Sequence, residues 1–292
     1  MKKRILLTGV TGFLGSHLAN SLLALGYEVV ALKRKLSKLR RVESFASDIV
    51  FFDIEGLDFD DLFRDCGKVD AIIHTATCYG RNNESVSDVF AANTEFPLRL
   101  LDAGNRAGVG LFLNTDTILD QYLNLYALSK NQLLQWGKFF SIHEKIRFGN
   151  IRLEHFYGPD DDPTKFTAYV INSCLGNIPE IKLTKGEQKR DFIYIDDVVS
   201  AYIILLERMG SFNAPFVEFE VGSGHSVSIR EFVETAHRLA DSHTHLEFGA
   251  LPYRGGEVMH SEADISGLAA LGWQCKNTLQ QGLQLTIDGI KR

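Results

Sequence analysis

Residues 4–15 read Arg4-Ile5-Leu6-Leu7-Thr8-Gly9-Val10-Thr11-Gly12-Phe13-Leu14-Gly15, and this stretch decides the fold. Its apolar start is typical of a buried strand, and the pattern from Leu14 to Leu25 is typical of a helix. The glycines between them form a GxxGxxG motif, which permits a tight turn and lets amides at the helix start face a pyrophosphate. A tight turn without a ligand is the simpler alternative. We expect cofactor contacts from Gly9, Thr11, Gly12, Phe13, Leu14 and Gly15.

The first 160 residues alternate short β-rich runs with helical segments, which is the signature of a parallel sheet. Helical periodicity is also clear from Val89 to Ala107. The pattern predicts an α/β fold: a Rossmann-type, doubly wound parallel sheet with a smaller C-terminal lobe. The expected strands are Arg4–Thr8, Glu28–Leu32, Ile49–Phe52, Ala71–His74, Gly110–Asn114 and Arg147–Leu153.

A loop rich in Asp and Pro, residues 158–163, marks a change of domain character. We therefore expect a dinucleotide-binding domain over 1–158 and a lobe over 159–292 that mainly binds substrate. Segments near 190–225 are expected to return to the first domain. The later elements are expected to be a strand at 192–195 and helices at 197–209 and 229–240.

Composition narrows the possible functions. The 292 residues include 31 Lys plus Arg and 37 Asp plus Glu, a net charge of −6, which argues against a nucleic-acid-binding surface. No apolar run approaches the ~20 residues of a membrane span, and the start of the chain does not read as a signal peptide. The four cysteines form no CxxC pair, so no metal site is expected. We expect a cytoplasmic protein that binds neither membrane nor nucleic acid.

The end of the second strand indicates which cofactor is used. An acid there would bind the free 2′-hydroxyl of NAD, whereas a cation would bind the 2′-phosphate of NADP. This chain has Lys33-Arg34-Lys35 and no acid between Ala31 and Arg41. A solvated basic loop is the alternative. We expect NADP, with Lys33 and Arg34 at its 2′-phosphate.

Tyr126 and Lys130 form a YxxxK motif after the fifth strand. Residues four apart share one face of a helix, so the ammonium can lower the pKa of the phenol and make it a proton donor. Thr115 can hold the substrate oxygen from the end of the strand. YxxxK also occurs by chance on helix surfaces, and its position in this fold is what favours the catalytic interpretation.

Together these residues resemble the extended short-chain dehydrogenase/reductase family, or NAD-dependent epimerase/dehydratase family, which acts on nucleotide sugars. The resemblance covers nearly the whole chain. It implies roles at the adenine, the pyrophosphate and the nicotinamide ribose for residues after the third and fourth strands, and a role for Asn93 in fixing the active-site strand. The cofactor-binding residues implied are Asp53, Ile54, Thr75, Ala76, Thr77, Asn93, Tyr126 and Lys130.

Later motifs extend the resemblance. Residues 152–159 and 190–198 are similar to R-x-F-N-V-Y-G-P and R-D-F-I-x-V-D-D-V, and Arg254 opens the closing motif. The family implies that Arg190 and Arg254 bind the substrate diphosphate, which suits their fork geometry. His155 replaces the usual Asn. We expect it to line the nicotinamide or diphosphate pocket, with a packed structural histidine as the alternative.

Residues 114–117 and 124–130 are most similar to the CDP-4-keto-3,6-dideoxyhexose reductases of this family. The implied reaction is hydride transfer from NADPH to the C4 carbonyl of the sugar, with catalysis by Thr115, Tyr126 and Lys130, and with Thr115 and Thr117 contacting substrate. Its products are precursors of bacterial surface polysaccharide such as the O-antigen of lipopolysaccharide. The family also implies a homodimer.

Three alternative functions are compatible with parts of this pattern. A 4-epimerase would retain tightly bound NAD, and a non-catalytic NADP sensor would commonly lack the Tyr-Lys pair. A 4,6-dehydratase places Asp-Glu after the active-site threonine, whereas this chain has Asp116 and Thr117. Elimination would lack a base there, and reduction needs none.

Overall fold

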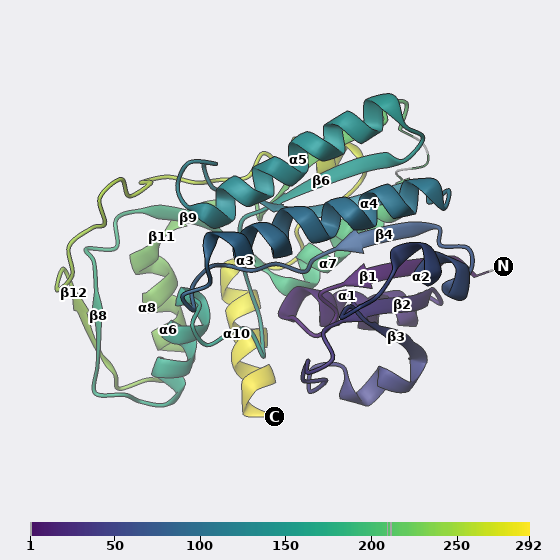
Figure 1. Cartoon of the computed structure of the whole chain (residues 1–292). Helices are drawn as coiled ribbons and strands as arrows, with labels where there is room; N and C mark the ends of the chain where they lie inside the picture. The colour runs from purple at the N-terminus through teal and green to yellow at the C-terminus, as the bar shows by residue number, and fades with distance from the viewer. Residues whose placement is uncertain (1, 209, 211) are drawn as a thin grey trace. The chain divides into compact units, whose positions relative to one another are not determined.

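The protein is described from a computed structural model, which covers residues 2–208, 210 and 212–292 (Figure 1). The chain divides into two compact units. The first comprises Met1–Leu153 and Tyr202–Phe219, and the second comprises Glu154–Ala201 and Glu220–Arg292. The assignment of cofactor to one part and substrate to the other, with a boundary at 158, stays a prediction.

A seven-stranded sheet organises the first unit. Its strand order is β10-β6-β5-β4-β1-β2-β3, with β1 between β2 and β4. The pairs among β1 to β6 are parallel, and Leu6 aligns with Val30 on one side and Ile72 on the other. This is the Rossmann arrangement that the sequence predicts. The strands are β1 Arg4–Thr8, β2 Glu28–Lys33, β3 Ile49–Asp53, β4 Ala71–His74, β5 Leu111–Thr117, β6 Arg147–Leu153 and β10 Phe216–Val221.

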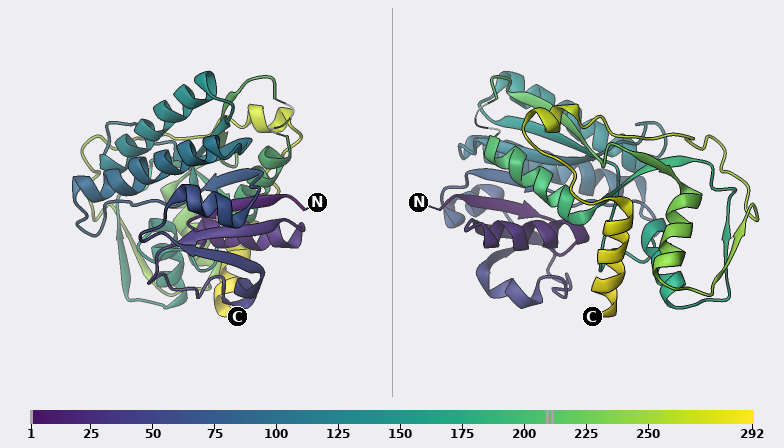
Figure 2. Two further views of the ribbon diagram at one scale, coloured as in Figure 1. Left: turned by 45° about the vertical axis from the view of Figure 1, so that its right-hand side comes forward. Right: turned by 180° about the vertical axis from the view of Figure 1, so that it is seen from behind.

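Helices cover both faces of this sheet. Helices α2, α4 and α5 lie on one face, and α1 and the 202–208 part of α7 lie on the other (Figures 1 and 2). A 3₁₀ helix, Glu43–Asp48, precedes β3, and a π turn, Ala91–Glu95, joins α3 to α4. The helices are α1 Phe13–Ala24, α2 Phe59–Cys66, α3 Val86–Phe90, α4 Phe96–Arg106, α5 Leu125–His143 and α7 Ile195–Arg208.

The core beneath α4 and α5 fixes the helix that carries the YxxxK motif. Phe112 and Phe148 stack there with ring centroids 5.5 Å apart, and both side chains are fully buried. A Cβ on Gly137 of α5 would collide with the Phe148 ring. The glycine therefore lets α5 lie directly on β6, so that its first turns are held at the carboxyl end of β5.

The second unit contains two small sheets. One has the order β11-β9-β7 and the other pairs β12 with β8. Phe192 of β9 stacks on Phe232 of α8, with ring centroids 4.2 Å apart. Its elements are β7 His155–Tyr157, α6 Phe166–Leu175, β8 Glu180–Leu183, β9 Lys189–Tyr194, β11 Ser226–Ser228, α8 Ile229–Leu239, β12 His245–Phe248, α9 Ser266–Ala270 and α10 Leu279–Lys291.

The elements differ from the sequence prediction in a few places. Strand β5 continues to Thr117, so both threonines near its end lie within the strand. The expected helix at 89–107 is interrupted by the π turn, and Ile195 opens α7 rather than ending a strand. Met209, the expected end of that helix, lies outside the described residues. No helix in the described part of the chain has the length and apolar character needed to cross a membrane.

Candidate active site

The glycine motif forms a tight loop between β1 and α1. Gly9 has φ +73°, and Gly12 N donates to Gly9 O at 2.9 Å. A Cβ on Gly15 would collide with the Gly9 backbone, so the helix needs glycine there to pack against the loop. No side chain caps α1, whose first turn begins with the buried Phe13 and Leu14. The loop thus leaves the first amides of α1 available for a ligand, as a pyrophosphate site requires.

Thr8 fixes the chain after β4 beside this loop. Its Oγ1 accepts from the amides of Thr75 and Ala76, both at 3.2 Å, and therefore donates its proton to His74 Nδ1 at 2.8 Å. Burial, with a smaller effect from Lys130, lowers the pKa of His74 well below its usual value. The structure thus places Gly9, Thr75 and Ala76 together, since a Cβ on Gly9 would come within 2.6 Å of Ala76 N.

The end of β2 differs from the expectation. The Lys33 ammonium forms an ion pair with Asp53, a residue that the family resemblance assigns to the adenine. Ile54 N donates to Lys33 O at 2.9 Å, which places Ile54 beside the same strand end. The Arg34 side chain is exposed and has no ion-pair partner among the described residues. Lys33 is thus partly neutralised within the chain, and the contact of Lys33 and Arg34 with a 2′-phosphate stays a prediction.

Arg41 is a further basic residue that approaches the glycine loop. Its Nη1 donates to Thr11 O at 3.4 Å. Nothing in the sequence indicates this contact, because Arg41 lies in the turn before the 3₁₀ helix, 30 residues from Thr11 along the chain. Its charge therefore adds to the positive side of the expected cofactor site.

Asn93 lies in the π turn and is fully buried. Its Oδ1 accepts from Cys78 N at 2.7 Å and from the Thr77 hydroxyl at 3.2 Å. Its Nδ2 donates to Cys78 O at 2.8 Å and to Ser129 Oγ at 2.9 Å. The amide is thus occupied by protein partners, so Asn93 contributes by tying the loop after β4 to α5. Direct cofactor contact by Asn93 and Thr77 stays a prediction.

Lys130 lies on α5, one turn after Tyr126, and only 1% of the residue is exposed. Its Nζ has no hydrogen-bond partner among the described residues. Burial lowers the pKa of Lys130 to about 8, and the negative charge of Asp116 opposes this shift. A buried ammonium without a partner is costly. The site therefore fits a ligand that brings hydroxyl oxygens to Lys130, as a nicotinamide ribose does.

Tyr126 stands in a different electrostatic environment from the one expected. Burial raises the pKa of the phenol well above its usual value, Tyr79 and Asp116 add to the rise, and a hydrogen bond with Thr117 opposes it. The expectation that Lys130 lowers this pKa toward neutrality is wrong for the chain alone, because burial outweighs every nearby charge. The phenol is protonated at neutral pH and can act as an acid.

The two threonines of β5 have different neighbours. Asn150 Oδ1 accepts from Asn114 and its Nδ2 donates to Asp116, both at 2.8 Å, so these two β5 side chains share one face. Thr115 points to the other face, where its hydroxyl lies 2.6 Å from Tyr202 OH of α7. Thr117, by contrast, acts on the Tyr126 phenol, whose pKa it lowers. The catalytic role of Thr115 stays a prediction, and Thr117 is a second hydroxyl that bears on the acid.

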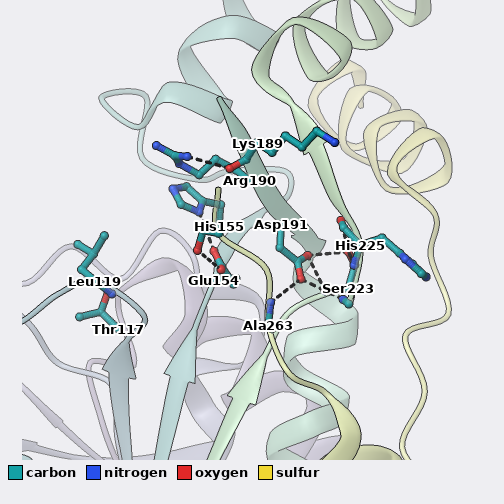
Figure 3. Close-up of polar contacts among 12 residues, drawn as sticks. Thr117, Leu119, Glu154, His155, Lys189, Arg190, Asp191, Ser223, His225 and Ala263 are labelled. Atoms are coloured by element: carbon teal, nitrogen blue, oxygen red, sulfur yellow. Dashed lines mark hydrogen bonds and ion pairs between the residues drawn. The ribbon is translucent and has the colours of Figure 1, made fainter. Parts of the chain in front are cut away.

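The basic residues predicted for the diphosphate, Arg190 and Arg254, lie in the second unit, and Figure 3 shows Arg190. Arg190 Nη2 pairs with Glu257 Oε1 at 2.6 Å, and the Arg190 side chain is largely buried. Arg254 is exposed, and its side chain has no ion-pair partner among the described residues. Arg190 is therefore already positioned, and a diphosphate would share it with Glu257.

His155 is held by a buried carboxylate. Glu154 Oε2 lies 3.0 Å from His155 Nδ1, and Ser261 donates to the other oxygen (Figure 3). The ring also meets Phe192 edge-on. This arrangement leaves Nε2 as the outward atom, and contact with a ligand stays a prediction. No group of three or more potential metal-ligating side chains lies within the described ranges.

Sequence reasoning missed Tyr79, Tyr202 and Glu257. Glu257 lies three residues after Arg254 in the closing motif, but nothing there pairs it with Arg190, which is 67 residues away. Tyr202 lies 87 residues from Thr115, and no pattern in the chain links them. Tyr79 follows the motif at the end of β4, and only the fold shows that it stacks on Tyr126.

The glycine loop, the order of the sheet and the adjacent Tyr126 and Lys130 define a Rossmann-type protein with the site of a short-chain dehydrogenase/reductase. Residues 5–217 match the model of the NAD dependent epimerase/dehydratase family. The chain belongs to that family.

Individual proteins show the same relationship. CDP-abequose synthase of Salmonella muenchen is 35% identical, with 97% of each chain covered. UDP-glucose 4-epimerase of Thermotoga maritima has a similar structure, with a TM-score of 0.86 at 22% identity over 99% of this chain and 98% of that one. UDP-glucuronic acid 4-epimerase of Bacillus cereus, solved with UDP-glucuronic acid and NAD, has a TM-score of 0.85 at 24% identity, with 99% of each chain covered.

Proposed function

We propose that this protein reduces the C4 keto group of a CDP-4-keto-3,6-dideoxyhexose with NADPH, as an oxidoreductase in the synthesis of bacterial surface polysaccharide. The observation that carries the proposal is Lys130, a buried ammonium without a partner, one helical turn from a protonated Tyr126. The 35% identity to a CDP-abequose synthase supports the choice of substrate class.

The residues of the first unit have separate roles in the proposed reaction. When bound, NADPH would supply the hydride for the carbonyl carbon. Tyr126 donates the proton that the carbonyl oxygen needs, and its raised pKa keeps that proton in place until the oxygen becomes basic. Thr117 lies beside the phenol and orients the same oxygen, in the role first expected of Thr115. Lys130 holds the nicotinamide ribose and keeps its charge close to Tyr126.

Reduction is favoured over elimination of water by the state of Asp116. Its Oδ2 accepts from Asn150 and its Oδ1 from Thr117 N, both at 2.8 Å, and the residue is buried. Its carboxylate is therefore engaged in holding the strand end. Thr117 follows it where a dehydratase of the family carries a base, so the pair lacks the acid and base that elimination requires.

NADPH is proposed over NADH because Arg34 remains free for a 2′-phosphate while Lys33 is shared with Asp53. One charge-assisted pair contributes roughly 1.5–3 kcal/mol, about tenfold to a hundredfold in affinity. We expect Arg34→Ala to erode the preference for NADPH more than Lys33→Ala does, with NADH binding unchanged. Fluorescence titration of both cofactors measures this, and equal affinities in the wild type would contradict it.

The second unit is proposed to supply the contacts to the substrate diphosphate. Arg190 is held in place by Glu257, and Arg254 offers an exposed guanidinium. Paired guanidinium groups suit the oxygens of a diphosphate. His155 is proposed to line the same ligand pockets, with its ring orientation set by Glu154.

A homodimer is proposed from the exposed apolar side chains of α5 and the neighbouring α3. On α5, Trp136 is 44% exposed and Ile142 is 70% exposed. Clustered apolar side chains that are this exposed are typical of a face covered by another protein chain. The other members of the patch are Val86, Phe90, Leu125, Leu128 and Phe139. A cytoplasmic location is part of the same proposal.

A nucleotide-sugar 4-epimerase remains the second candidate, because relatives and structures at lower identity carry that name. The two functions differ in their use of cofactor. A reductase consumes NADPH in proportion to product, whereas an epimerase retains NAD and converts its substrate without added reductant.

The proposal is tested by a screen of CDP-, dTDP-, UDP- and GDP-linked 4-keto sugars for NADPH consumption. We expect the CDP-4-keto-3,6-dideoxyhexose to be reduced fastest, with one NADPH oxidised per sugar. Conversion of an intact hexose nucleotide into its epimer without added NADPH would replace the proposal with the epimerase.

A further inference from the structure

The loop between β4 and α3 carries an aromatic ring and a cation that form a tilted stack with the proposed acid. The Tyr79 and Tyr126 ring centroids are 5.0 Å apart, with a 39° angle between the planes. The Arg81 guanidinium lies over the Tyr79 ring, 4.8 Å from its centroid. Arg81 is exposed and forms no ion pair with another described residue. The stack therefore connects the exposed Arg81 to the Tyr126 phenol through one intervening ring, that of Tyr79.

The loop is fixed at its base, so the stack is a defined part of the fold. Asn93 binds both the amide and the carbonyl of Cys78, directly before Tyr79, and also binds Ser129 of α5. Ser129 Oγ in turn donates to Tyr126 O at 2.8 Å. One buried amide thus ties the Tyr79 loop to the helical turn that presents Tyr126. The π turn places Asn93 there, and such turns are frequent at functional sites.

We propose that Tyr79 and Arg81 are positioning residues for Tyr126: the Tyr79 ring fixes the phenol against the end of β5, and the Arg81 cation acts through that ring. This inference rests on the proposed function, because it presumes that Tyr126 is the acid. Nothing in the glycine motif, the YxxxK motif or the diphosphate motifs assigns a role to either residue.

The neighbouring charges act on the phenol in opposite directions. Three titratable groups other than the phenol itself bear on its pKa: Tyr79, Asp116 and Arg81. Tyr79 and Asp116 act against formation of a phenolate and raise the pKa of Tyr126, whereas the positive charge of Arg81 lowers it. Once the phenol has donated its proton, Arg81 therefore stabilises the negative charge left behind, and the ring between them limits rearrangement.

The expected effects follow from the size of such contacts. An aromatic pair contributes enough for Tyr79→Leu to lower kcat roughly two- to tenfold, while Tyr79→Phe, which keeps the ring, retains the wild-type value. A cation–π contact at an exposed site predicts a loss of roughly two- to fivefold for Arg81→Gln, with Arg81→Lys recovering most of it. The KM for NADPH is expected to stay unchanged in all four variants.

The matched control is Arg99→Gln. Arg99 is also an exposed arginine over an aromatic ring, 5.5 Å from the centroid of Phe59, but it lies on α4 away from Tyr126. We expect it to leave kcat and both KM values unchanged. Thermal unfolding of every variant separates a loss of positioning from a loss of fold.

The experiment is single-turnover reduction of CDP-4-keto-3,6-dideoxyglucose with NADPH deuterated at C4, because an isotope effect shows that the chemical step is being measured. Losses in Tyr79→Leu and Arg81→Gln that the conservative variants recover would support the inference. Wild-type rates in both, or equal losses in Tyr79→Phe and Tyr79→Leu, would overturn it. Full activity in Tyr126→Phe would overturn the proposed function instead, so the two failures are distinguishable.

Discussion

At the scale of single residues, burial shifts the pKa values of Lys130 and Tyr126 in opposite directions. Burial favours the neutral form of each side chain, so it lowers the pKa of the amine and raises that of the phenol. Among the described residues, the Lys130 ammonium has no hydrogen-bond partner, whereas the phenol has Thr117 beside it. The two side chains are therefore prepared for ligands that supply oxygen atoms to the ammonium and accept a proton from the phenol.

Removing the phenolic hydroxyl tests the acid directly. We expect Tyr126→Phe to lower kcat by about 10²- to 10⁴-fold, the usual contribution of a general acid, while NADPH affinity stays nearly intact because the ring remains. Tyr122→Phe is the matched control, since Tyr122 is 81% exposed and lies just before α5. Stopped-flow kinetics and cofactor titration measure the two effects, and a fully active Tyr126→Phe would show that another group donates the proton.

Lys130 gives a prediction that needs no substrate. Its pKa of about 8 in the folded chain lies below the ~10.4 of an unfolded lysine, so the unfolded state binds the proton more tightly. The cost of burying the charge is fully present below about pH 8 and fades as the pH rises toward ~10.4. Cofactor-free Lys130→Met should thus be more stable than the wild type at pH 7, by on the order of 1–3 kcal/mol.

Urea unfolding from about pH 7 to 10 measures this difference, which should shrink across the range because the wild type gains stability. NADPH should reverse the order at pH 7, because its ribose gives Lys130 a partner that methionine cannot use. A wild type that is more stable than Lys130→Met without cofactor, with a difference that does not change with pH, would contradict the account.

At the scale of elements, the end of β5 carries two threonines that could serve the site. The strand continues to Thr117, Thr115 contacts Tyr202 of α7, and Thr117 acts on the pKa of the Tyr126 phenol. Strand alternation alone does not distinguish them, because residues two apart face the same side of the sheet. We expect Thr117→Val to lower kcat roughly two- to tenfold through loss of one hydrogen bond. Thr115→Val should mainly lower the unfolding temperature, because it leaves the buried Tyr202 hydroxyl unpaired. A larger catalytic loss in Thr115→Val would restore the first assignment.

The same elements also show which parts of the fold can be predicted from the sequence. The strands up to β6, the glycine turn and α1 follow from periodicity and glycine placement, because each depends on neighbouring residues. The expected strand stopped at Asn114, since Thr115, Asp116 and Thr117 are polar. The Asp116 carboxylate accepts from Asn150, 34 residues away, and the Thr115 hydroxyl pairs with Tyr202, 87 residues away. Pairing of that kind leaves no local pattern.

At the scale of the whole molecule, the exposed apolar face of α5 predicts an oligomer. We expect Phe139→Glu, at a side chain that is 51% exposed, to convert the dimer into a monomer, because a buried unpaired charge is costly at an interface. Leu36→Glu is the control, since Leu36 is 92% exposed and lies in the loop after β2. Light scattering after size-exclusion chromatography gives the masses. A wild-type monomer would refute the dimer.

At the same scale, the sequence motifs predicted some features of the molecule and left others open. The family, the parallel sheet and the Tyr-Lys pair could all be predicted from the sequence, because each depends on short motifs of residues that are close along the chain. The Lys33–Asp53 and Arg190–Glu257 pairs could not, since they join cations to acids 20 and 67 residues away. Such pairs determine which cations remain free to bind phosphate groups. The sequence therefore predicted the basic positions but not which of them form ion pairs with acids.

The central claim is that a hydride passes from NADPH to C4 of a CDP-linked 4-keto sugar at Tyr126 and Lys130. The most direct measurement is mass spectrometry and NMR of the product formed with NADPH carrying deuterium at C4 of its nicotinamide ring. We predict a product one mass unit heavier than that made with ordinary NADPH, with the deuterium at C4 of the sugar and one NADPH oxidised per product. Product without deuterium, formed at the same rate when NADPH is left out, would contradict the account.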